Sequence, residues 1–435
     1  MKLSKRLIFS FLITLLTISW SIRCFAAPPT GWVDENTVTT THFEIHWEGS
    51  STISHYATDG WIEKVKQYLE DAWNFQVLTW QRPPGVVDNS VRITVEVWDI
   101  YNEHGYGATI WGEASDPANI WLDNDYSPGS FTVSGEDGLM MTTAHEFFHC
   151  VQPNWIDKDT WDNTFFDNDW FTEGCADWMA DQQYDSINEY IPNETAEAFL
   201  NSPEIPLDEK TGQAAYGCVL FWLFLSENKS ANINDIFSNF KNQGYMDFLM
   251  ATAKGLGDTD WGGNSSNQIW KDFTVACYVK TGVDGFKDDG ASDPDFPDVK
   301  IDFTTNSYPV PEQTKSLNHL ASHYTLFEPD DLTVDKALRI KFNGPDGKDF
   351  GAMVVKEDIG GTKTKEEISL DPNSQDGFYL NTNFGKTYPK VALISSNPTK
   401  SDDNLQYKYF AKFPSTIIPT LIDGTQSSVF YPGDP

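Results

Sequence analysis

The segment AHEFFHCVQ, residues 144–152, places two histidines four positions apart with a glutamate directly after the first. On an α-helix, positions four apart differ by only about 40° in rotation, so the rings of His145 and His149 would project from one face, one turn apart. Two such rings can bind one metal ion, and Glu146 would then lie beside that ion, within reach of a water molecule on it. The alternative is a pair of core histidines satisfied by hydrogen bonds.

A catalytic zinc ion typically takes three protein ligands and keeps a fourth position for water. Glu173, in the segment WFTEG, is the expected third ligand, because it opens the next predicted helix and Gly174 would let that helix approach the first one closely. The alternative for Glu173 is an exposed acid that interacts with the helix dipole. Asp177 follows one turn later on the same face, and its carboxylate could accept the outer N–H of His145 or His149.

The elements that must position these residues follow a mixed pattern. Alternating residues at 40–48, 92–98 and 119–123 predict strands, and an apolar stripe over 61–80 predicts a helix. A helix opened by Ser134 or Gly135 would carry both histidines and end before Pro153. Further helices are expected after Trp170, over the almost wholly apolar residues 212–226, and over 267–280. Beyond the Gly-, Asp- and Pro-rich residues 282–297, seven short runs with a period of two predict a β-sandwich.

The N-terminus has the pattern of a secretory leader. Lys2, Lys5 and Arg6 precede an apolar run from Leu7 to Trp20, which is short for a membrane span, so residues 1–26 are predicted to be a signal peptide. No later stretch reaches membrane-spanning length without charges. The mature chain is therefore expected to be soluble and secreted, either extracellular or periplasmic, with no membrane span.

The charge of the chain excludes one class of partner. With 64 acidic against 30 basic side chains, the protein's own field would repel phosphate, so no nucleic-acid partner is expected. Calcium would suit the charge better, but the aspartate clusters at 157–169 and 284–298 lack the spacing of a calcium loop, which leaves Ca²⁺ unsupported. The sequence does not predict the oligomeric state.

Removal of the leader would take Cys24 away and leave an even number of cysteines in an oxidising compartment. Such a count favours disulfides, although four cysteines allow three pairings. Pairing Cys150 with Cys175 would join the two ligand-bearing helices, and Cys218 with Cys277 would join two later ones. Free buried thiols are the alternative.

A second pair of histidines, His319 and His323, repeats the spacing of four without a glutamate between them. They lie where the pattern turns to strands, and on a strand positions four apart are about 13 Å apart, too far to share an ion. These two histidines are expected to be structural.

At these motifs the chain resembles the gluzincin class of zinc metallopeptidases, and in particular a set of secreted bacterial proteins with HE(F/Y)xHxxQ and WxxEGxA motifs. The resemblance covers roughly residues 41–280, and its motifs are specific over about thirty residues. It implies zinc bound by His145, His149 and Glu173, with Glu146 as the general base. It also suggests Tyr216, on the apolar segment AAYGCVLFWLF, as the donor to a developing oxyanion, whereas a tyrosine on an apolar helix is otherwise a core residue.

These observations predict an α+β fold: a zincin-like catalytic domain over residues 27–299 with a mostly helical C-terminal half, a β-sandwich over 300–415 and a tail over 416–435. The expected function is that of a secreted zinc metallopeptidase, whose protein or peptide substrate is hydrolysed by water that Glu146 deprotonates. The alternative is an exported binding or adhesion protein, in which the sandwich binds the ligand and the zinc site is structural or inactive.

Overall fold

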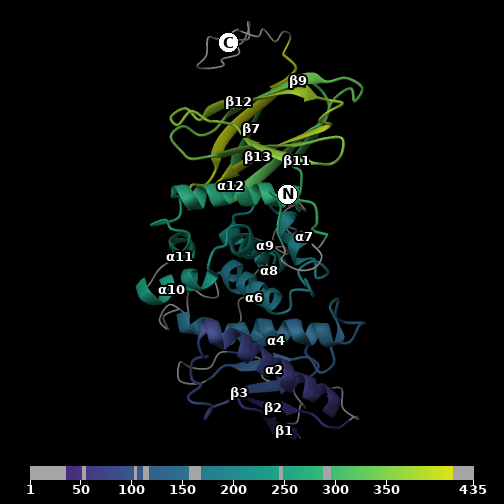
Figure 1. The fold of residues 1–435 in the computed structure, drawn as a ribbon, viewed down its shortest axis with the longest axis vertical. Coiled ribbons are helices and arrows are strands. Elements are labelled where there is room, and N and C mark those ends of the chain that lie inside the picture. The colour runs from purple at the N-terminus through teal and green to yellow at the C-terminus, as the bar shows by residue number, and fades with distance from the viewer. Residues whose placement is uncertain are drawn as a thin grey trace, which may run out of the picture.

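A computed structural model describes residues 36–50, 55–101, 105–110, 117–155, 168–243, 248–287 and 295–414. The molecule is elongated and built as a stack: a five-stranded sheet with two long helices at one end, a group of helices in the middle, and two further sheets at the other end (Figure 1). The mixed α+β class is therefore confirmed. The expected signal peptide and C-terminal tail lie outside the described residues, as do most of the two aspartate clusters.

The N-terminal sheet has the strand order β1-β2-β3-β5-β4. β2, β3 and β5 are parallel, and an antiparallel strand flanks them on each side. β2 and β3 bury every second residue, as their alternating sequences require. The strand bounds are β1 (Asn36–Thr39), β2 (Phe43–Trp47), β3 (Ile93–Val97), β4 (Gly107–Ile110) and β5 (Asn119–Leu122).

Two long helices, α2 (Asp59–Trp80) and α4 (Gly135–Val151), pack on this sheet and against each other. Thr58 caps α2, since its hydroxyl accepts the backbone N–H of Trp61. α4 is buried along nearly all of its length, and a short 3-10 turn (Gln152–Trp155) follows it, as expected from Pro153. A helix buried on all sides is a rigid support for the two histidines it carries.

α6 (Asp169–Gln183) is the second ligand-bearing helix and packs along α4. The prediction that Gly174 faces α4 was wrong. A Cβ at Gly174 would lie 2.9 Å from the Cβ of Cys218. This glycine therefore allows the close approach of the segment around Cys218, which comes after α7 (Thr195–Leu200) in the chain, and not of α4. α6 is therefore enclosed between α4 and that segment.

The predicted single helix over 212–226 was also wrong in form. It consists of α8 (Gln213–Tyr216), α9 (Val219–Leu223) and a π-helical turn (Phe224–Asn228). The break falls at Gly217, where a Cβ would lie only 2.1 Å from the carbonyl oxygen of Thr195. The remaining helices of the middle layer are α10 (Ile233–Gln243), α11 (Phe248–Gly255) and α12 (Asn264–Val279).

The C-terminal part contains two antiparallel-rich sheets, ordered β11-β10-β13-β8-β6 and β12-β9-β14-β7. Buried side chains of both sheets form one apolar cluster, so the expected sandwich is present. Two of its strands had not been predicted, β6 and β7. The bounds are β6 (Phe303–Thr305), β7 (Val310–Leu317), β8 (Ala321–Phe327), β9 (Lys336–Asn343), β10 (Gly351–Glu357), β11 (Lys363–Glu367), β12 (Asp376–Phe384), β13 (Lys390–Asn397) and β14 (Leu405–Lys412).

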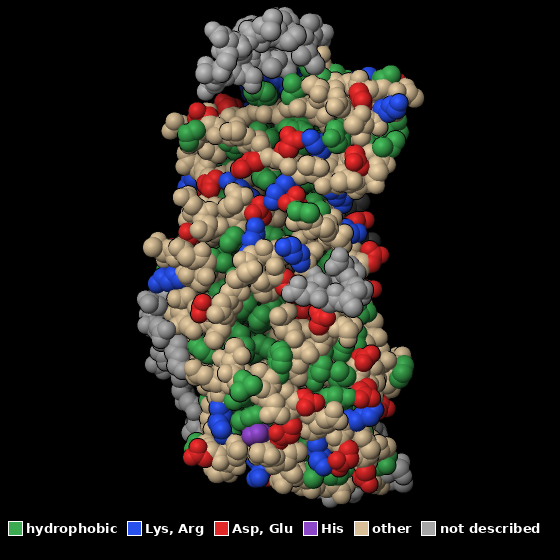
Figure 2. All heavy atoms as spheres, viewed as in Figure 1, with side chains coloured by type: hydrophobic (Ala, Val, Ile, Leu, Met, Phe, Trp, Pro, Cys, Tyr) green, Lys and Arg blue, Asp and Glu red, His purple; other side chains and the backbone are tan. Residues whose placement is uncertain are grey.

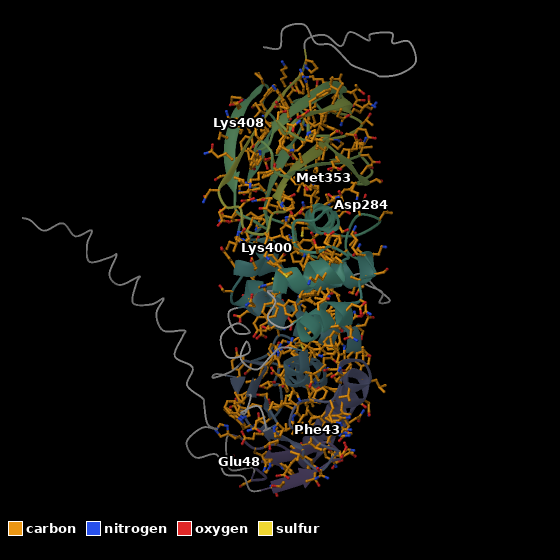
Figure 3. The ribbon with its side chains drawn as sticks, turned by 90° about the vertical axis from the view of Figure 1, so that its left-hand side faces the viewer. Phe43, Glu48, Asp284, Met353, Lys400 and Lys408 are labelled. Carbon is orange, nitrogen blue, oxygen red and sulfur yellow. The ribbon has the colours of Figure 1, made fainter. Side chains whose placement is uncertain are left out.

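The first of these sheets is covered on both faces, because α12 packs on the side that faces the helices. Met353 and Val355 of β10 belong to the helical core, whereas Val354 between them belongs to the sandwich core. Figure 3 shows Met353 at this junction and Phe43 in the sheet at the far end of the molecule.

On the face seen in Figure 2, acidic and basic side chains are interspersed over the whole length. Among the described residues, no helix combines the length and apolar character that crossing a bilayer requires.

Candidate metal centre

Three potential ligand atoms converge where α4 and α6 pack together. Nε2 of His149 lies 3.0 Å from Nε2 of His145 and 3.2 Å from Oε2 of Glu173, and the His145–Glu173 pair is 3.3 Å apart. A tetrahedral zinc ion with bonds of about 2.0–2.1 Å keeps its ligand atoms about 3.3 Å apart. The two imidazoles and the carboxylate therefore fit a zinc ion in chemistry and in spacing, and they form a group of possible metal ligands among the described residues.

Each histidine ring is held by its other nitrogen. Nδ1 of His145 lies 2.7 Å from Oδ1 of Asp177, and Nδ1 of His149 lies 2.8 Å from Oε1 of Gln152. Gln152 in turn donates its amide N–H to the carbonyl oxygen of Thr172, which fixes its oxygen toward the ring. Because both partners are acceptors, Nδ1 carries the proton in each ring and Nε2 offers its lone pair to the centre.

Glu146 lies beside the ligands and is positioned by β4. The hydroxyl of Thr109 lies 2.7 Å from Oε2 of Glu146 and 2.8 Å from its backbone oxygen. The neighbouring Gly107 has no room for a Cβ, which would approach the Cγ of Glu146 to 2.8 Å. Burial raises the pKa of the Glu146 carboxyl above its usual value, which makes it a better proton acceptor.

The charges around the centre favour a cation in it. Burial alone would lower the pKa of His145, but its hydrogen bonds to Asp177 and Glu173 outweigh burial and raise it. Burial alone would raise the pKa of the Glu173 carboxyl, but its interactions with the two histidines outweigh burial and lower that pKa far below the usual range. A divalent ion between these groups would replace the protons that the acidic surroundings otherwise draw onto the rings.

Tyr216 lies at the mouth of the site. Its ring stacks on that of His145, with centroids 5.9 Å apart and planes 18° apart. With 37% of its surface exposed, Tyr216 is not the core residue that the alternative predicted. The Glu173 charge, followed by burial, raises the pKa of the Tyr216 hydroxyl well above its usual value, so this group remains a hydrogen-bond donor.

A pocket of about 410 Å³ opens beside the centre. It is bounded by α4, α6 and α8, by the loop and strand around β4, and by the turn that precedes α7. The polar side chains that line it include His145, Glu146, Asp177, Glu189, Asn193 and Tyr216. Such a volume is within the range of pockets that hold a small ligand or a few residues of a peptide.

The sequence had indicated several of these residues and missed others. The structure brings His145, His149, Glu173, Glu146, Asp177 and Tyr216 together. Gln152 was missed, although its place three residues after His149 on the same helix face was a signal. Thr109 and Glu189 had no such signal, because they reach the site from a short edge strand and a turn.

The competing sites have other roles in the structure. The four cysteines among the described residues are buried free thiols, so neither expected disulfide is formed. Burial raises the pKa of Cys150 and Cys175 well above the usual range, which keeps both thiols protonated. His323 bonds through Nδ1 to the hydroxyl of Tyr407, and the two nitrogens of His319 bond to two aspartates.

No protein-family model matches the chain, and no curated protein matches it. Among solved structures, it is similar to the enzymatically active domain of tailspike protein 4 of bacteriophage CBA120, with a TM-score of 0.17 and 10% identity over 25% of this chain and 18% of that one. A family GH115 4-O-methyl-α-glucuronidase with specificity for decorated arabinogalactans gives a TM-score of 0.17 and 10% identity, over 74% and 55% of the two chains. The chain thus spans less than two thirds of either structure, and similarities this low carry no argument about fold or function.

Proposed function

We propose that this protein is an exported zinc-dependent metallopeptidase with a zincin-like catalytic unit. One observation carries the proposal: two imidazoles and one carboxylate converge at zinc-ligand spacing directly beside a buried glutamate that lines a pocket. A structural zinc site needs four protein ligands and no neighbouring base. Here the described ligand group has three members, and Glu146 stands next to it.

The roles of the side chains follow from their positions. Zinc held by His145, His149 and Glu173 would supply a Lewis acid that acidifies water and polarises a peptide carbonyl. Glu146, oriented by Thr109, is placed to take the proton of the attacking water and to deliver it to the leaving amine. Tyr216 keeps its hydroxyl proton and can donate it in a hydrogen bond to the developing oxyanion.

The edge strand β4 supports a peptide as the substrate. In the described part of the chain, β4 is an edge strand of the sheet and pairs on one side only, with β5. It contacts α4 and contributes Gly107 to the pocket beside Glu146. An extended peptide could add to this edge through backbone hydrogen bonds, which would lay its carbonyl groups along the site.

The decisive experiment is the substitution Glu146→Gln in the zinc-loaded protein. The amide keeps the size of the side chain but cannot accept a proton, so we expect zinc content to be retained and hydrolysis of a casein-type substrate to fall by about 10²–10⁴-fold. Glu136→Gln is the matched control, because Glu136 lies in the first turn of the same helix and bonds to Lys64 instead. Turnover unchanged in Glu146→Gln would refute the role of Glu146 as the base, and a zinc-loaded wild type without hydrolysis would favour the binding or adhesion protein with a structural zinc site.

A further inference from the structure

Glu189 is a buried carboxyl group that the proposed reaction does not use. It lies in the turn between α6 and α7, is 2% exposed, and lines the pocket beside Glu146 and Asp177. No other residue in the described part of the chain hydrogen-bonds to either of its carboxylate oxygens. A buried carboxylate without a partner costs several kcal/mol relative to water, so its retention at this place requires a partner that arrives from outside or a bound proton.

Hydrogen bonds on both sides of Glu189 hold the backbone of the turn that carries it. The backbone oxygen of Glu189 accepts the N–H of Asn193, whose side-chain oxygen accepts the hydroxyl of Tyr106. Asn188 bonds to the hydroxyl of Tyr190, which is completely buried. The position of Glu189 in the pocket is thus set by the fold on both sides of the residue.

The pocket around Glu189 is suited to a positive charge. Among the described residues, its lining contains the acids Glu146, Asp177 and Glu189, the rings of Tyr101, Tyr106 and Tyr216, and His145 as the one basic side chain, without any lysine or arginine. Carboxylates attract a cation directly, and tyrosine faces attract it through their quadrupoles. Asp177 is already engaged by His145, which leaves Glu189 as the carboxyl group free to pair with a ligand.

We propose that Glu189 is a specificity-determining residue that binds an ammonium or guanidinium group of the substrate in this pocket. The inference rests on the proposed peptidase function and names its substrate class: peptides with a cationic group close to the scissile bond. Two sources share this chemistry, a lysine or arginine side chain and the free amino terminus of the peptide. Pairs of peptides that differ in only one of these groups can distinguish the two sources.

The proton on Glu189 provides an independent readout. Burial, followed by the nearby charge of Asp177, raises the pKa of the Glu189 carboxyl to about 8. The raised pKa favours a proton on the carboxyl group when no ligand is bound, and pairing with a cation should release that proton. A residue with only a structural role would not couple ligand binding to proton release.

The test uses the zinc-loaded protein and two pairs of fluorogenic peptides. One pair differs only in arginine against its neutral isostere citrulline, and the other in a free against an acetylated amino terminus. We expect the wild type to prefer the charged member of one pair by about 30-fold or more in kcat/KM, and Glu189→Gln to abolish that preference. Glu189→Asp, which keeps the charge, should restore part of it, and Glu197→Gln, an exposed acid near the same turn, should keep it in full.

Binding decides the inference separately from catalysis. In the Glu146→Gln background, calorimetry with the preferred peptide in two buffers of different ionisation enthalpy should show up to one proton released at pH 7, and none when Glu189→Gln is added. Values of kcat/KM that do not depend on the charge of the peptide, or a preference for the charged peptide that is unchanged in Glu189→Gln, would overturn the inference and leave the peptidase proposal intact. If no peptide is hydrolysed, the peptidase proposal fails, and equal binding of charged and neutral peptides would then overturn this inference too.

Discussion

The two histidines of the centre depend on partners of different charge. His145 is oriented by the carboxylate of Asp177, and His149 by the neutral amide of Gln152. Both members of the His145–Asp177 pair are almost fully buried, with 8% and 7% of their side chains exposed. The carboxylate therefore raises the basicity of the His145 ring in surroundings where water screens it little, and the amide cannot do the same for His149.

We expect Asp177→Asn to weaken zinc binding by about 10- to 100-fold, because the amide removes the charge that supports His145 and offers an N–H to the ring as readily as an oxygen. Competition with a chromophoric chelator at fixed pH would measure the affinity. Asp71→Asn, on the exposed face of α2, is the control and should bind zinc as the wild type does. Equal affinities in the two variants would mean that packing alone orients the His145 ring.

At the scale of elements, the sequence was most informative where an apolar period runs over several turns. The bounds of α2, α4 and α12 agree with prediction to within a few residues, because a continuous stripe and a proline or glycine at the ends define each helix. β4 was missed, since four residues, GATI, are too few to show a period. Gly174 shows that a glycine can indicate a close approach without indicating which element approaches.

The site was predictable to the extent that its residues share a helix. His145, Glu146 and His149 follow from spacing on α4, and Asp177 follows from its distance of one turn from Glu173 on α6. Thr109 and Glu189 were not predictable, because their contacts join elements that are far apart in sequence and only the packing of the sheet edge and the turn brings them together.

The contact between β4 and α4 leads to a prediction at Gly107. A methyl group there would lie 2.6 Å from Cγ2 of Thr142 and 2.8 Å from Glu146, so β4 must move away from α4. We expect Gly107→Ala to lower the free energy of unfolding by about 1–3 kcal/mol and to reduce kcat/KM with zinc content unchanged. Gly129→Ala is the control, since a Cβ at Gly129 meets open space. Full activity and stability in Gly107→Ala would show that Glu146 does not depend on β4.

At the scale of the whole molecule, the sandwich is joined to the helices through a continuous core. Leu320 and Tyr324 belong to the core of the helical part, and the hydroxyl of Tyr324 donates to the carbonyl oxygen of Thr274 in α12. Leu207 donates its backbone N–H to Leu320, which ties the two parts together near the end of β7. The sandwich is thus a fixed part of the structure that supports α12, and through α12 the helices around the site.

A buried ionic contact at this junction predicts how stability depends on pH. His319 lies between Asp208 of the helical part, at 2.9 Å, and Asp403 of the sandwich, at 2.7 Å. The hydrogen bond to Asp208 raises the pKa of His319 from 6.5 to about 9; burial acts in the opposite direction, and the bond to Asp403 acts in the same direction. A raised pKa means that the folded state holds the proton more tightly, so the contribution of this contact to the free energy of unfolding is complete below about pH 6.5 and is lost as pH rises through 9. Because both aspartates are partly hydrated, we expect this contribution to be about 1–2 kcal/mol. Urea unfolding of the wild type and His319→Gln at pH 6 and pH 10 would measure it: the variant should be less stable at pH 6, and the difference should shrink at pH 10. A difference that is the same at both pH values would show that the contact between the two parts does not depend on the charge of His319.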